Sequence, residues 1–201
     1  MKVQVRSGEM TDSELPDWLI PPPEGFHAED LDHLPGLPAH TELIDGSLVL
    51  VGPQEDFHTL MLYLLESGLR RTVPADLRVR REMSVVLGPR QRPEPDVVVL
   101  HARGIRGPGV TAYRAEDVVL AIEVVSPESE ERDRKRKPQL YAEAGIPHFW
   151  LVETCEGHPS VNVYELDATT RAYVLSGSHQ GRVRITVPFD IDIDLTEIDR
   201  L

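Results

Sequence analysis

The sequence contains one cysteine, Cys155, in 201 residues. No internal disulfide can form, which excludes the disulfide frameworks of small secreted domains. No apolar run approaches the ~20 residues that a membrane-spanning helix requires. Residues 1–25 also lack the apolar core of a signal peptide. These absences predict a protein of a reducing, cytoplasmic compartment that does not enter a membrane.

Several motifs that mark common catalytic and binding sites are missing as well. The eight histidines show no metal-ligand spacing with one another or with Cys155, so no structural zinc site is expected. The chain has no glycine loop that could cradle phosphates and no Gly-x-Ser-x-Gly elbow. Nothing therefore indicates a P-loop nucleotide site or a serine nucleophile.

Positive charge is scarce, and the formal net charge is −13. Such a balance argues against a broad nucleic-acid-binding surface. The distribution is uneven, because residues 1–38 hold eight acidic residues against Lys2 and Arg6, whereas residues 68–106 hold nine arginines against four acidic residues. Arginines of the 70–92 region are candidates for contacts with phosphates, although a solvated surface explains them equally well.

The hydrophobic pattern predicts an ordered sequence of elements. Residues 1–25 end in three prolines and are expected to be a poorly ordered tail, with a single domain over 26–201. Asp45-Gly46 between apolar runs predicts a hairpin, and helical spacing predicts a core-facing helix over 55–70. Strands are expected over 77–87, 96–100, 118–125, 148–152, 161–166, 172–175 and 183–188.

A second, short helix is predicted over 139–145, where Gly145 would end it. The strands 96–100 and 118–125 are apolar almost throughout, as in central strands that are covered on both faces. The expected fold is therefore α/β, with a mixed central β-sheet, a helix packed on each side and extra β-hairpins.

Two carboxylates are placed unusually in these apolar strands. Asp96 opens the first of them, and Glu123 interrupts the second. A carboxylate inside a buried strand is costly unless a cation or strong donors meet it. With Lys137 following, the pair could hold a hard divalent metal beside a water nucleophile. Alternatively, Asp96 is a turn residue and Glu123 belongs to a structural ion pair.

Six segments of the chain support the first interpretation. They are Glu42-Leu43-Ile44-Asp45-Gly46, His58, Pro95-Asp96, Glu123-Val124-Val125-Ser126-Pro127, Asp133-x-x-x-Lys137-x-x-x-Tyr141 and Ala144-Gly145-Ile146-Pro147-His148-Phe149-Trp150. In order and spacing this set resembles the Uma-two family of predicted restriction endonucleases, within the PD-(D/E)XK nuclease superfamily, from Phe26 to Glu197. The resemblance implies a restriction endonuclease-like fold and hydrolysis of DNA phosphodiester bonds with Mg²⁺ or Mn²⁺ as cofactor.

The resemblance also implies the roles of particular residues. Asp96 and Glu123 would hold the metal, joined by the backbone carbonyl of Val124 and by Glu42. The superfamily normally places its lysine two residues after the glutamate on the same strand, but Val125 stands there in this chain. In the Uma-two variant a lysine of the following helix enters the same space.

Lys137 matches that lysine and would orient the attacking water or stabilise negative charge. Asp133, Lys137 and Tyr141 are four residues apart, so a continuous helix would carry them on one face. Pro138 favours a helix that begins near it, with Lys137 at the N-terminal end of that helix. If the segment is irregular, Lys135 is the alternative lysine for the site. Because Lys137 lies outside the apolar strands, its replacement by alanine is expected to leave the fold nearly intact.

Other polar or aromatic residues of these segments have simpler interpretations. His58 is a minor candidate for the site and could equally be a helix-start or core histidine. The remaining assignments are turn chemistry for Asp45, a cap for Ser126, and core packing for Tyr141 and Trp150.

Three functions remain open from the sequence. The first is a Mg²⁺-dependent endonuclease with DNA as its partner. The second is a non-catalytic binding or assembly module, in which the acids and the lysine form an internal ion-pair network. The third is a metal-dependent hydrolase of another substrate. A homodimer is compatible with each of them, and no membrane partner is expected.

Overall fold

A computed structural model describes residues 20–201 and shows a six-stranded central sheet. β7 and β8 are parallel, and all other neighbours are antiparallel, so the sheet is mixed as predicted. Residues 1–19 of the predicted tail lie outside the described residues, and the single domain over 26–201 stays a prediction. In spatial order the strands are β10 (Ala172–Gln180), β9 (His158–Asp167), β8 (His148–Cys155), β7 (Val118–Val124), β5 (Val97–His101) and β3 (Leu77–Arg81).

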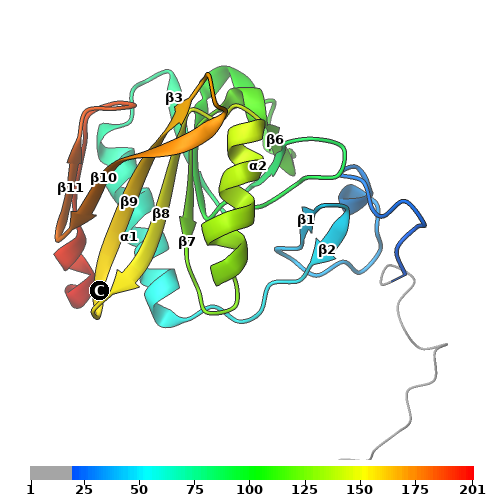
Figure 1. The fold of residues 1–201 in the computed structure, drawn as a ribbon, viewed down its shortest axis with the longest axis horizontal. Coiled ribbons are helices and arrows are strands. Elements are labelled where there is room, and N and C mark those ends of the chain that lie inside the picture. Colours follow the sequence, from blue (N-terminus) through cyan, green and yellow to red (C-terminus); the bar gives the residue numbers. More distant parts are fainter. Residues whose placement is uncertain (1–19) are drawn as a thin grey trace, which may run out of the picture.

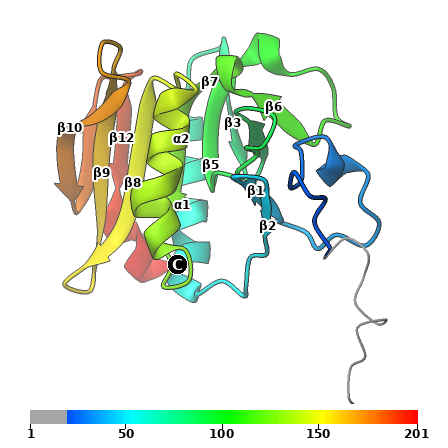
Figure 2. The same cartoon turned by 45° about the vertical axis from the view of Figure 1, so that its right-hand side comes forward.

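Among the described residues, two α-helices cover opposite faces of this sheet (Figures 1 and 2). Side chains alternate between faces along a strand, so each central strand feeds two cores. α1 (Asp56–Thr72) packs on Val97, Val99 and Ile122, whereas Tyr141 of α2 (Lys137–Glu143) lies with Val98, Leu100 and Ala121. The predicted α/β architecture with a helix on each face is confirmed.

The predicted hairpin is present as β1 (Glu42–Ile44) and β2 (Ser47–Val49). Asp45 and Gly46 both have positive φ, 54° and 79°, as a two-residue type I′ turn requires. The amide of Leu43 donates to the carbonyl of Arg92, and the amide of Arg92 donates back. These bonds hold the hairpin against the segment that leads into β5, where Glu42 accepts from the amide of Glu94.

The prediction of one strand over 77–87 is wrong. β3 ends at Arg81, because Glu82 adopts a left-handed conformation (φ 51°) and its amide donates to the carbonyl of Asp96. The chain then turns into β4 (Ser84–Val86), which pairs in parallel with β6 (Ala112–Arg114) in a separate small sheet. An apolar alternation runs through both strands, so the sequence pattern does not mark the break.

The segment before α2 is continuous with it. Arg132–Arg136 form a π-helical turn, η6, and α2 begins at Lys137 with Pro138 in its first turn, as predicted. Gly145, at φ 82°, ends the helix. A π-turn is wider than an α-turn and commonly occurs at functional sites.

The C-terminal part adds elements that the sequence pattern did not predict in full. β11 (Arg182–Ile185) pairs with β12 (Ile191–Asp194) in a two-stranded sheet over α1, and a 3-10 helix, η7 (Leu195–Arg200), follows. Other short 3-10 helices are η3 (Asp30–Asp32), η4 (Ala102–Gly104) and η5 (Ala115–Asp117). Within residues 20–201, no helix combines the length and the apolar character that crossing a membrane demands.

Candidate active site

Three buried carboxylates surround the ammonium group of Lys137. Its Nζ atom lies 2.9 Å from Glu42 Oε1, 3.0 Å from Glu123 Oε2 and 3.1 Å from Asp133 Oδ1. The acids come from β1, β7 and η6, elements far apart in the sequence, and all four residues are buried. One of the three ammonium donors bonds to Glu123, and the carboxylates of Glu42 and Asp133 lie within ion-pair distance.

Asp133 and Tyr141 complete this cluster from the helical segment. Both lie on the same face as Lys137, as their spacing predicts. The Tyr141 hydroxyl donates to Glu123 Oε1 at 2.5 Å, so Tyr141 is core, as predicted, and also a direct partner of the site. Asp133 Oδ1 contacts Lys137 but has no hydrogen bond of good geometry, and it is fully buried.

Burial and charge shift the protonation of this cluster. Burial raises the pKa of Glu123 well above its usual value, against the pull of Lys137, and burial also raises the pKa of Asp133. Burial disfavours the charged ammonium of Lys137, but attraction from Glu123, Glu42 and Asp133 outweighs it and raises the Lys137 pKa well above normal. Because acids outnumber bases, the lysine keeps its proton, and a carboxyl group holds its proton to higher pH.

Asp96 lies next to this cluster, immediately before the first residue of β5. Val97 pairs with Ile122, so Asp96 stands at the level of Glu123 on the neighbouring strand. Asp96 Oδ2 accepts from the amide of Val124 at 2.6 Å, and Oδ1 lies 2.9 Å from His58 Nε2. His58 is buried, so this minor candidate is a direct partner of Asp96.

A cavity of about 150 Å³ opens over these groups. Two basic side chains, Lys137 and Arg132, line it, with His40 and His58. Lys135 does not line it and is exposed beside Glu131, so of the two candidate lysines only Lys137 lies at the cavity. The acidic residues of the lining are Glu42, Glu82, Glu94, Asp96, Glu123, Glu128 and Asp133.

Glu94 and His40 form a pair at the rim that sequence reasoning missed. Their side chains are 2.5 Å apart, and the amide of Glu94 donates to Glu42 Oε1. Burial raises the pKa of Glu94, and the hydrogen bond with Glu94 raises the pKa of His40. The position of Glu94 two residues before Asp96 is a signal that could have identified it, whereas His40 lies far away in the sequence.

The donor set fits a hard divalent cation in its chemistry. Carboxylate oxygens dominate the lining, negative charge is in excess, and the buried Asp133 Oδ1 lacks a good donor. Among residues 20–201, however, no three acidic, histidine or cysteine side chains already stand together as a metal-binding group. Lys137 pairs with Glu42, Glu123 and Asp133, and Asp96 is engaged by His58 and by the amide of Val124.

Two expectations about basic residues need correction. Lys137 lies outside the apolar strands, as expected, but it is only 4% exposed and paired with three carboxylates, which weighs against the expectation that its removal leaves the fold nearly intact. Arg92 is buried in an ion pair with Asp32 at 2.9 Å and is therefore unavailable for phosphates. Arg90 donates to the carbonyl of Asp45 and stays exposed.

Three comparisons with known proteins bear on these observations. The family model of Uma2, described as "Putative restriction endonuclease", matches residues 28–196. A crystal structure from Anabaena variabilis ATCC 29413, described as "a putative nuclease belonging to DUF820", is similar at a TM-score of 0.65 and 15% identity. This likeness covers 85% of the present chain and 95% of the other, and at this identity it shows the fold alone. A search among curated proteins found no match.

These findings confirm the resemblance and the restriction endonuclease-like core. The matched range contains the hairpin, both central strands, η6 and α2, which together supply every residue of the buried cluster. The chain belongs to the Uma2 family of restriction endonuclease-like proteins.

Proposed function

We propose that this protein is a divalent-metal-dependent endonuclease that hydrolyses phosphodiester bonds in DNA. The observation that carries the proposal is the buried group of Glu42, Glu123 and Asp133 around Lys137, next to Asp96 at an open cavity. Membership of a nuclease-like family and the oxygen-rich donor set support it.

Asp96, Glu123, Glu42 and the carbonyl of Val124 would hold Mg²⁺ or Mn²⁺. When bound, such an ion supplies Lewis-acid polarisation of the phosphate and lowers the pKa of a water molecule. Asp96 is held in place by His58 and by the Val124 amide, so its carboxylate is oriented before any ligand arrives.

The protonation of Lys137 limits what this residue can do. Its raised pKa keeps the ammonium charged at neutral pH, so Lys137 donates hydrogen bonds and stabilises negative charge and does not act as a base. Glu94 lines the same cavity, is only partly buried and has a raised pKa, which suits it to accept a proton from water.

Plasmid cleavage tests the proposal. The wild type is expected to cut plasmid DNA with Mg²⁺ or Mn²⁺ and to stop in EDTA. Glu123→Gln should be inactive while still folded, and Glu116→Gln, which changes an exposed residue of η5, should cut like the wild type. A folded wild type that cuts no DNA with any divalent metal would end the nuclease assignment.

A non-catalytic assembly module is the second candidate. It is favoured by one observation, the ion pairs of Lys137 with three buried carboxylates, which are the contacts expected of a structural network. It predicts that divalent metals neither stabilise the protein nor support cleavage. A homodimer stays a prediction under both functions.

A further inference from the structure

Arg132 differs from the other basic residues of the run 130–137. It has no ion pair and no side-chain hydrogen bond with any of residues 20–201. The other four basic residues all have acidic partners: Arg134 with Glu130 and Glu153, Lys135 with Glu131, Arg136 with Asp45, and Lys137 with Glu42, Glu123 and Asp133.

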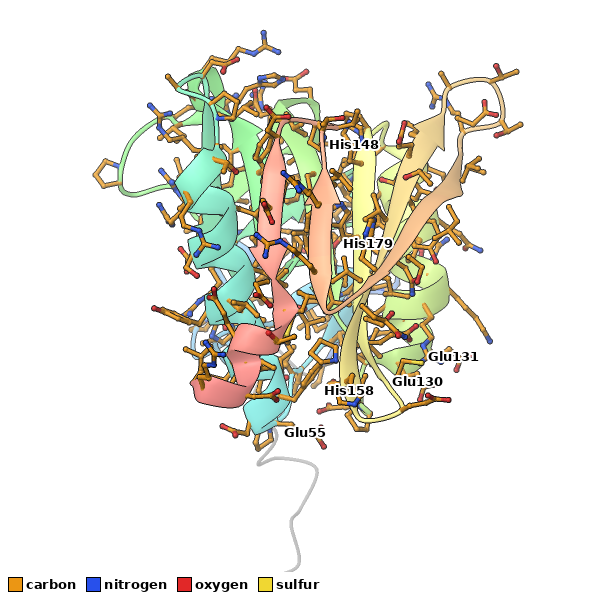
Figure 3. All side chains as sticks on the ribbon, turned by 90° about the vertical axis from the view of Figure 1, so that its left-hand side faces the viewer. Glu55, Glu130, Glu131, His148, His158 and His179 are labelled. Carbon is orange, nitrogen blue, oxygen red and sulfur yellow. The ribbon has the colours of Figure 1, made fainter. Side chains whose placement is uncertain are left out.

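The π-turn explains where the Arg132 side chain lies. η6 begins at Arg132, and both Arg132 and the adjacent Asp133 line the active-site cavity. Arg134 is exposed, does not line the cavity and pairs with Glu130, which Figure 3 shows with Glu131 at the edge of the molecule.

Arg132 Nε is fully buried and has no hydrogen-bond partner among the described residues. A buried donor without a partner is unfavourable, and a ligand that accepts from it removes this cost. The donor therefore indicates that an acceptor from outside the chain completes the site.

The charge of the cavity indicates which acceptor that is. A phosphodiester is an anion, and the lining is dominated by carboxylates. Lys137 is already paired with three carboxylates in the structure described, so its positive charge is largely offset there. Arg132 is the other permanently charged cation of the lining, and its planar guanidinium matches the paired oxygens of a phosphate.

We propose that Arg132 is the substrate-binding cation of the active site and donates to the non-bridging oxygens of a backbone phosphate of nucleic acid. This inference rests on the proposed nuclease function and names the group that binds its substrate. The contact reads no base, so it would contribute to affinity without sequence preference.

DNA binding by the full chain tests the assignment, read as fluorescence anisotropy of a short labelled duplex with Ca²⁺ in place of Mg²⁺. A gel run in parallel shows that the duplex stays intact. Arg132→Gln is expected to weaken binding by about tenfold, the loss of one charge-assisted contact. Arg134→Gln removes the same charge two residues away, from a side chain with its own acidic partners, and should change the affinity by less than about twofold.

Arg132→Lys is the second variant, because it keeps the charge and the stem but loses the planar fork. Arg132→Lys should bind DNA with an affinity between those of the wild type and Arg132→Gln. If circular dichroism shows that Arg132→Gln is unfolded, the comparison of Arg132→Lys with the wild type replaces it as the test. Equal effects of Arg132→Gln and Arg134→Gln would show a general charge effect and overturn the assignment. No DNA binding by the wild type would overturn it as well. A wild type that binds DNA but never cuts it would refute the nuclease function. The comparison of Arg132→Gln with Arg134→Gln would still decide whether Arg132 binds the phosphate.

Discussion

Replacement of Lys137 by methionine tests the buried cluster most directly. Methionine keeps the approximate length of the side chain but removes the charge, so Glu42, Glu123 and Asp133 would be left around an uncharged group. Removing one partner of a buried ionic network typically costs about 3–5 kcal/mol. For a chain of this size, about 2–4 °C per kcal/mol converts this loss into a Tm decrease of about 6–20 °C.

The loss should depend on pH. The pKa values of Glu123 and Asp133 are already raised by burial in the wild type, and loss of the ammonium raises them further. An acid whose pKa is higher in the folded state binds more protons there, so stability falls as pH rises from the unfolded value of about 4 towards the folded one. The deficit of Lys137→Met should therefore be larger at pH 8 than at pH 5.

Urea denaturation at several pH values measures this deficit. Lys135→Met is the matched control, because it removes an exposed lysine of the same segment whose partner, Glu131, is also exposed. The control should change stability by less than about 0.5 kcal/mol. A loss below about 1 kcal/mol for Lys137→Met at pH 8, with no pH dependence, would refute the structural role of the cluster.

Three further predictions follow from the same geometry. Tyr141→Phe removes the hydroxyl that donates to Glu123, and urea denaturation should show a loss of about 1.5–3 kcal/mol. Arg92→Leu leaves Asp32 without its bidentate partner and should lower the Tm while DNA binding by the folded protein stays unchanged; weakened binding would contradict the structural role of Arg92. Mg²⁺ should raise the Tm of the wild type, because at a hundred times its Kd it adds about 2.7 kcal/mol to the free energy of unfolding. Asp96→Asn should reduce this increase in Tm. No Tm change at saturating metal would count against a metal site.

Local patterns were sufficient for much of the fold. Asp45-Gly46 specified the hairpin turn, because only a few residue types adopt positive φ readily. The apolar run after Asp96 and the apolar run around Glu123 marked the two central strands, because strands covered on both faces must be apolar on both faces. The same reasoning identified Glu123 as a buried carboxylate that needs a partner.

The break at Glu82 could not be predicted in this way. It depends on a hydrogen bond to Asp96, which comes from another part of the chain. An apolar alternation describes which face a residue occupies but not which sheet it joins, so β3 and β4 appeared as one strand.

The sequence by itself determined the central strands, the hairpin turn and the acid buried in a central strand, since these follow from backbone sterics and from the cost of burying charge. Only the tertiary structure decided how the charges meet. It placed Glu42, Asp133 and Tyr141 around Lys137 and Glu123, and it tied Arg92 to Asp32. Among the described residues, it left Arg132 without a partner at the cavity. Neighbouring residues of the charged run 130–137 therefore have different roles. The π-turn and the packing of distant strands decide which of these side chains are buried and which partners they contact, and no local sequence pattern encodes either of them.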